Sequence, residues 1–300
     1  MLNTVDALAA LLHGSWLEKH TLTPLTIAES EQIAFALQVE AANALAAWQL
    51  LRSHLQQTQR YPILSEGWGS DDFFARFYYQ EEVSSGTLQN TSPESILAQV
   101  ATADTDAFLA ARQAASADYL EDAIPSALEN TKAYCGTCPT ESKIRELIAD
   151  GTVCTELDLE KWLFNWELQN CEAKALTPLD TCHLDWFTPD NPTLLLLPID
   201  QGWQSLAYLH WYGACSVGTP IASRFLQKWH QQYHAELVCH YGTMLQLQVG
   251  KRPASPAAAF ELAWQQVALA ECTILLPGVS LRDQARALLN LDRWFLHERP

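Results

Sequence analysis

A run of apolar residues at positions 193–199, Thr-Leu-Leu-Leu-Leu-Pro-Ile, is the feature that most restricts how this chain can fold. The run has the length of one strand and does not alternate between apolar and polar residues, a pattern typical of a strand buried on both faces. Such a strand needs a sheet that is covered by helices. The run is also far shorter than the roughly 20 residues that a membrane-spanning helix requires.

Strand and helix patterns are interspersed after this run. The predicted elements are a helix from Thr219-Pro220 to Tyr233, a hairpin of residues 236–240 and 244–249 around Gly242, a helix from Ser255-Pro256, a short strand at 272–276, a helix with capping-box spacing from Ser280, and a last strand at 293–296. These elements predict a layered α/β domain with a mixed sheet over residues 193–300.

Residues 1–192 have a different texture, because helical patterns dominate them. The predicted elements are a short amphipathic helix at 4–13, a long helix at 30–55, an edge strand at 60–64 that tolerates Pro62, and helices that begin at Ser92-Pro93, Thr140 and Leu157. The fold class expected for the whole chain is therefore α+β. A mainly helical, acidic region (1–192) precedes an α+β domain (193–300).

The charge of the chain narrows the kinds of partner it can have. The net charge is −17, from 18 Lys and Arg against 35 Asp and Glu. Residues 1–192 hold 10 of these basic and 28 of these acidic residues, whereas residues 193–300 hold 8 and 7. Nucleic acids and anionic membranes both require a basic face, so neither is expected as a partner. An acidic face suits a basic protein partner; no sequence feature indicates the oligomeric state.

The compartment is inferred from the start of the chain and from its cysteines. The first residues, Met-Leu-Asn-Thr-Val-Asp, lack the basic and apolar regions of a secretory signal. Eight cysteines in 300 residues are too few for a secreted disulfide scaffold. We expect a reduced cytoplasmic protein.

Several motifs of the C-terminal region occur in a recognisable order. They are Trp229-x3-Tyr233-x-Ala-Glu-Leu-Val, Leu245-x-Leu-x-Val249, Arg252-Pro253, Ala263, Cys272-x-Ile274, Gly278 and Trp294-Phe295. With these motifs, residues 193–300 resemble a bacterial family known as domain of unknown function 4253. Trp48 and residues 60–64 resemble the segment that precedes the family's main domain. Because the family has no established activity, the resemblance implies a fold and no chemistry.

A cysteine pair is the strongest metal-like signal. Cys135 and Cys138 form a CxxC motif that could hold zinc if two further ligands completed a tetrahedron. The candidates for these ligands are Cys154, Cys171, Cys182 and His183. Zinc is therefore the one cofactor that the sequence suggests. The alternatives are thiol–disulfide exchange at the start of the following helix, or reduced cysteines without a function.

Histidines and aromatic residues cluster in the C-terminal region. His230 and His234 are spaced to share a helix face, but Gln231 stands where a metalloprotease has its general base. Cys215 could be a nucleophile beside His210 or His240, or a small buried cysteine. The candidate ligand-pocket residues are Trp203, His210, Trp211, Cys215, His230, His234, Glu236 and His240. The competing interpretation is that most of the aromatic residues fill the core.

Acidic pairs next to aromatic residues suggest a surface for a protein partner. The candidate residues of this face are Asp71, Asp72, Phe73, Phe74, Glu81 and Glu82. Because no complete catalytic set is present, the leading hypothesis is a non-enzymatic protein-binding module of the immunity or inhibitor type. The alternative is a small-molecule-binding protein or enzyme with a pocket in residues 193–300.

Overall fold

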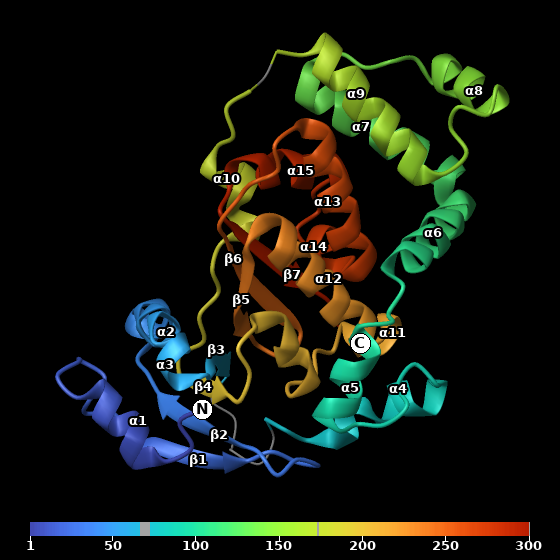
Figure 1. Cartoon of the computed structure of the whole chain (residues 1–300). Helices are drawn as coiled ribbons and strands as arrows, with labels where there is room; N and C mark the ends of the chain where they lie inside the picture. The colour runs from blue at the N-terminus through green and yellow to red at the C-terminus, as the bar shows by residue number, and fades with distance from the viewer. Residues whose placement is uncertain (67–72, 173, 300) are drawn as a thin grey trace. The chain divides into compact units, whose positions relative to one another are not determined.

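The computed structural model describes residues 1–66, 73–172 and 174–299 (Figure 1). The chain forms two compact units, each built from separate stretches of the sequence. Unit 1 consists of residues 1–103, 184–251 and 292–300, and unit 2 consists of residues 104–183 and 252–291.

Unit 1 contains a mixed sheet, which within the described residues has seven strands in the order β1-β2-β4-β3-β5-β6-β7. The strands are β1 (Leu22–Thr26), β2 (Ile33–Gln38), β3 (Tyr61–Glu66), β4 (Pro192–Leu197), β5 (Ala235–His240), β6 (Met244–Val249) and β7 (Arg293–His297). All neighbours are antiparallel except β3 and β5, which are parallel. All six residues of β4 are buried, as expected from the apolar run. The predicted α+β class with a mixed sheet is confirmed.

Helices cover this sheet, and local capping signals explain where several of them begin. The helical elements of unit 1 are α1 (Val5–Leu12), η1 (Ala41–Asn43), α2 (Ala44–Ser53), α3 (Leu55–Thr58), η2 (Arg76–Tyr79), α4 (Gln80–Ser85), α5 (Pro93–Val100), η5 (Gly202–Ala207), α11 (Ala214–Val217) and α12 (Thr219–Tyr233). The side chain of Ser92 caps α5, as its position before a proline predicts. Helix α2 packs on β3 and β4, and α12 packs on β5.

The predicted long helix at 30–55 is wrong in its first half. Residues 33–38 form β2, and the helix begins only at Ala44. Strand β2 is hydrogen-bonded to β1 on one side and to β4 on the other, with Phe35 opposite Leu196. These long-range pairings outweigh the weak local preference for helix. The first strand, β1, has no counterpart among the predicted elements.

The predicted strand at 60–64 exists as β3, but it lies inside the sheet and not at its edge. It pairs with β4 along its whole length and with β5 only at Leu64 and Ser65. The backbone carbonyl of Pro62 accepts a hydrogen bond from Trp48 Nε1 at 2.8 Å. Because Pro62 lies before Leu64 and Ser65, the residues that pair with β5, its missing N–H removes no hydrogen bond between β3 and β5.

Unit 2 is helical in all of its described elements. They are α6 (Thr105–Ala115), η3 (Ser116–Tyr119), α7 (Leu120–Cys135), α8 (Glu141–Ala149), α9 (Glu156–Asn170), α10 (Pro178–Thr181), α13 (Pro256–Leu269), α14 (Cys272–Leu275) and α15 (Leu281–Asn290); η4 (Cys182–Leu184) lies at the boundary with unit 1. Thr140 caps α8, and Ser280 and Asp283 form the predicted capping box of α15. The predicted strand at 272–276 is wrong: it is the short helix α14, and Leu275 is 64% exposed.

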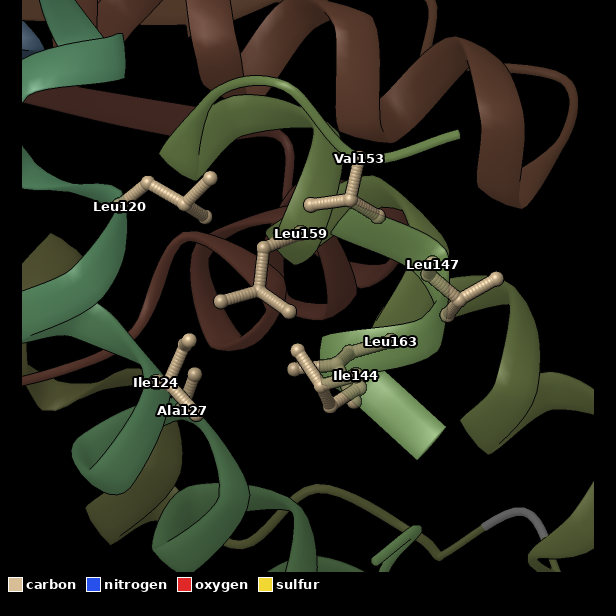
Figure 2. Packing of buried hydrophobic residues seen from close by; sticks show 8 residues of the cluster. All are labelled: Leu120, Ile124, Ala127, Ile144, Leu147, Val153, Leu159 and Leu163. Atoms are coloured by element: carbon tan, nitrogen blue, oxygen red, sulfur yellow. The ribbon is translucent and has the colours of Figure 1, made fainter. Parts of the chain in front are cut away.

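Apolar side chains from three consecutive helices, and from the loop between the second and the third, form one core of unit 2. Figure 2 shows them between α7, α8 and α9: Leu120, Ile124, Ala127, Ile144, Leu147, Val153, Leu159 and Leu163. Ile144, Leu159 and Leu163 are completely buried. Burying each such aliphatic side chain stabilises the unit by about 1.5–3 kcal/mol.

A buried ionic network accompanies this core. The guanidinium of Arg282 is fully buried and donates to Glu167 Oε1 at 2.9 Å and to Thr131 Oγ1 at 2.7 Å. Its Nε lies 3.1 Å from Glu160 Oε2. Burial, only partly offset by Arg282, raises the pKa of Glu160 to about 7. Removing one member of such a network would leave a buried charge without its partner.

The two units are divided differently from the predicted regions 1–192 and 193–300, because β1, β2 and β3 belong to the same sheet as the C-terminal strands. The acidic excess of residues 1–192 is shared about equally between the two units: unit 1 has 9 basic against 17 acidic residues, and unit 2 has 9 against 18. Among the described residues, no helix has the length and apolar character needed to cross a membrane.

Candidate functional site

A hollow in unit 1 lies where β3 and β5 end. These strands are parallel, and Ser65 pairs with His240, so both strands reach the same end of the sheet. The lining residues are Ser65, Glu66, Phe73, Tyr78, Leu209, His210, Tyr212, His240, Tyr241 and Gly242. The cavity volume is about 50 Å³, which is room for a few water molecules or the end of a larger ligand.

The turn between β5 and β6 brings Gly242 close to Tyr212, which also lines the hollow. Gly242 has a φ of +75°, a conformation that glycine adopts without strain. Its carbonyl accepts from the backbone N–H of Tyr212 at 3.1 Å. A Cβ at this position would lie 3.2 Å from the Tyr212 ring, so glycine also provides the space that the ring needs.

A fully buried carboxylate, Glu82, lies behind the hollow. It accepts hydrogen bonds from the Thr219 backbone N–H at 2.6 Å, from Thr219 Oγ1 at 2.7 Å and from His210 Nε2 at 3.2 Å. Thr219 is the first residue of α12, so Glu82 supplies acceptors to a helix N-terminus, where a negative charge is favourable. Three donors therefore compensate the cost of burying this side chain.

The hydrogen bond to Glu82 determines which nitrogen of the His210 ring carries a proton. Since the carboxylate accepts at Nε2, that nitrogen carries a proton, and in the neutral ring Nδ1 is then the acceptor. Nδ1 is buried and has no hydrogen-bond partner among the described residues. Glu82 thus orients His210, a lining residue of the hollow, and leaves its Nδ1 without a hydrogen-bond partner among the described residues.

Three tyrosine rings hold His210 in place. The Tyr78 ring is stacked with the imidazole at 6.1 Å between centroids, and the Tyr79 and Tyr212 rings approach it edge-on at 4.8 and 5.8 Å. Tyr79 is itself fixed by a hydrogen bond from its hydroxyl to the carbonyl of Leu206 at 2.9 Å. A ring packed in this way keeps its orientation whether or not a ligand is present.

His240 is the second histidine of the hollow. Burial, together with the neighbouring His210, lowers the pKa of His240 to about 4, and hydrogen bonding with the backbone opposes this shift only in part. The ring is therefore neutral at physiological pH. Its Nε2 is buried and has no partner among the described residues.

Cys215 lies beside His210 but is poorly suited to be a nucleophile. Its sulfur is 3.8 Å from His210 Nε2, the nitrogen that Glu82 already binds. Burial and the charges of Glu81 and Glu82 raise the pKa of Cys215 to about 11. Because the thiolate is the reactive form, this thiol is not activated.

The remaining predicted pocket residues lie elsewhere in unit 1. Trp203 is half-buried in η5 and does not line the hollow, and Trp211 is fully buried with its Nε1 bonded to the carbonyl of Thr243. His230 bonds through Nδ1 to the carbonyl of Ala235 at 3.2 Å. These residues belong to the framework of the unit.

His234 and Glu236 line a different hollow, near Arg52 and Gly250. The expected shared helix face of His230 and His234 is wrong, because α12 ends at Tyr233 and His234 has a left-handed φ of +50°. Glu236 accepts from both Nε and Nη2 of Arg52, the former at 2.8 Å. It is thus occupied by an ion pair.

The cysteine motif does not form the expected zinc knuckle. Cys135 and Cys171 are joined by a disulfide, so neither offers a thiolate to a metal. Cys138 is half-buried, while Cys154 and Cys182 lie at exposed positions. His183 bonds to Gln284 Oε1 at 2.8 Å. The described part of the chain contains no cluster of three or more His, Cys, Asp or Glu side chains arranged for a metal.

The expected partner face is wrong for two of its residues. Phe74 is 3% exposed and Glu82 is completely buried, so neither can contact another protein. Phe73 is half-buried and Glu81 is exposed. Asp71 and Asp72 lie outside the described residues.

Glu82, Glu66, Tyr78 and Thr219 belong to the site but are not among the residues that the sequence predicts for it. One signal was available for Glu82: it stands three residues after Tyr79, so the two share a face of a helical segment. A buried Tyr79 therefore turns Glu82 inward.

These features define a class of protein: an α+β protein with a hollow of histidines and tyrosines at the end of its mixed sheet. Residues 193–297 match the model of a family described as domain of unknown function (DUF4253), which confirms the resemblance of the C-terminal region. Neither the curated proteins nor the solved structures give a significant match. The matched segment, about a third of the chain, contributes His210, His240 and Thr219 to the site, whereas Glu82 and Tyr78 precede it.

Proposed function

We propose that unit 1 binds a small ligand in the hollow at the end of β3 and β5. The observation that carries this proposal is a pair of buried ring nitrogens without partners, His210 Nδ1 and His240 Nε2, in the lining of one cavity. A buried polar atom without a partner costs about 1–3 kcal/mol. A ligand that bonds to both nitrogens would remove this cost.

The size and walls of the hollow support binding of one end of a molecule. The cavity of about 50 Å³ admits a small polar group, and Phe73, Tyr78 and Tyr212 supply aromatic walls. Polar atoms at the base with apolar walls are the usual composition of a ligand site.

If the bound ligand also reacts, proton transfer is the chemistry that this site supports. A carboxylate behind a histidine is the arrangement by which many enzymes orient a general base. Glu82 holds the proton on Nε2, so Nδ1 is free to accept one from the ligand. Nucleophilic catalysis by Cys215 is disfavoured by its raised pKa.

Nitrogen NMR of the histidine side chains tests the proposal directly. The protein is labelled with ¹⁵N in its imidazoles and mixed with a library of small polar fragments. A fragment that enters the hollow shifts the signals of His210 and His240 and leaves the exposed His13 unchanged. A library whose members shift none of the hollow's signals at millimolar concentration would refute the proposal.

A second candidate is the protein-binding role, of the immunity or inhibitor type, that the acidic sequence suggests. The net charge of −17 favours it, and both units contribute to this charge. Capture experiments at low and high salt test it, because an electrostatic partner is retained only at low salt. Capture that does not depend on salt would contradict a role for the acidic surface.

A further inference from the structure

The charge around the hollow restricts what can enter it. Glu66 is the only charged residue among the described residues that line it; no Lys or Arg is among them. Glu82 is buried behind His210, and Glu81 precedes it in the first turn of α4. Burial is the main cause of the raised pKa of the nearby Cys215 thiol, and the charges of both carboxylates raise it further. An anionic ligand would be repelled here.

The hydrogen-bonding groups point to a ligand that donates. Because Glu82 accepts the hydrogen bond from His210 Nε2–H, the unpartnered Nδ1 of this tautomer accepts and cannot donate. The carboxylate of Glu66 also only accepts when ionised. A group with two or more N–H bonds could satisfy both.

The aromatic walls favour a positive charge over a neutral group of the same shape. The rings of Phe73, Tyr78, Tyr212 and Tyr241 line the hollow. The face of an aromatic ring attracts a cation, by about 0.5–2 kcal/mol depending on how far water is excluded.

We propose that the hollow takes an organic cation with N–H donors, an ammonium or guanidinium group, which donates to His210 Nδ1 and to Glu66 and lies against the tyrosine rings. This inference rests on the proposed function and adds the chemical class of the ligand. The group could belong to a free amine or to a lysine or arginine side chain of a peptide.

The test uses probes that differ only in charge. Binding of n-butylammonium and of n-butanol is measured at pH 8 by titration of the ¹⁵N-imidazole signals of His210 and His240. The charged probe is expected to bind about tenfold more tightly. Equal affinity for the two probes, or tighter binding of n-butanol, would overturn the inference while leaving the proposed ligand site intact. Failure of all polar fragments to shift these signals would overturn both.

Two variants and one further comparison sharpen the test. Glu66→Gln keeps the shape of the rim and removes its charge, and it is expected to weaken n-butylammonium binding about tenfold. Glu31→Gln, which changes an exposed carboxylate outside the hollow, is the matched control. Equal affinities of the two variants would count against the inference.

A lysine tripeptide and its norleucine analogue separate the two sources of the cation. A lysine peptide that binds more tightly than n-butylammonium indicates a protein ligand, and the reverse indicates a free amine.

Discussion

Acidification should destabilise unit 1 through His240. Burial, together with His210, lowers the pKa of this histidine from its ordinary value of 6.5 to about 4. Between pH 6.5 and pH 4, His240 is protonated in the unfolded chain and neutral in the folded chain. The free energy of unfolding therefore decreases as the pH falls below 6.5. The whole decrease in unfolding free energy, reached once the pH is below the folded-state pKa, is about 3 kcal/mol. At pH 5.0 the decrease relative to pH 7.5 is about 2 kcal/mol.

The assay is urea unfolding at pH 7.5 and pH 5.0, followed by tryptophan fluorescence. Wild type alone is a poor reporter, because Glu160 in unit 2 acts in the opposite direction. Its pKa is raised to about 7, so the folded chain binds the proton more tightly and gains stability as the pH falls from 7. The informative quantity is the difference between wild type and His240→Gln, since Glu160 contributes equally to both.

Wild type should lose about 2 kcal/mol more than His240→Gln over this pH range. The comparison does not depend on any constant loss of stability that the substitution itself causes. Equal pH dependence in the two proteins would refute the conclusion that His240 is buried in its neutral form. A matched Glu160→Gln variant should shift the pH dependence in the opposite direction.

The other predictions concern buried pairs. Glu82→Gln places an amide N–H₂ among three donors and should lower the unfolding free energy, measured with urea, by about 3 kcal/mol. The control variant Glu81→Gln, at the exposed neighbouring residue, should lower it by less than about 0.5 kcal/mol. Equal effects would contradict the buried position of Glu82. Reducing the disulfide of Cys135 and Cys171, which are 36 residues apart, should cost about 4 kcal/mol, measured by thermal unfolding with and without reductant. An intact-mass measurement that finds all eight cysteines reduced would contradict the disulfide itself. Arg282→Ala should cost about 3–5 kcal/mol in unfolding free energy, and Arg282→Met distinctly less if packing replaces the ion pairs.

Local signals in the sequence were sufficient where a helix start depends on one turn of backbone. Ser92, Thr140 and Ser280 each cap the helix that their position predicts, because a cap bonds to N–H groups two or three residues away. The same kind of reasoning failed at residues 33–38. Their apolar residues fit either a helix or a strand, and the choice is made by β1 and β4, one of which lies far away in the sequence.

The site shows the same limit. His210 and His240 are candidates from the sequence alone, because imidazole groups near aromatic residues are recognisable as chemistry. Glu82, the partner of His210, stands 128 residues before it, and no local rule connects the two. The adjacent carboxylates Glu81 and Glu82 predict a solvated acidic pair, since such pairs are normally exposed. Only the fold shows that one of the pair points inward to the start of α12.

The order of the strands explains why the family match and the fold have different boundaries. The matched segment begins within β4 and contains β5, but these two strands are not neighbours, since β3 lies between them. Without residues 61–66 the segment would have a gap in the middle of its sheet and would lack Ser65 and Glu66 at the hollow. The upstream resemblance at residues 60–64 therefore has a structural reason: this stretch is an inner strand of the same sheet. The hollow is built from the matched segment, its upstream strand and residues 73–78 together, so a search for a ligand requires the whole of unit 1.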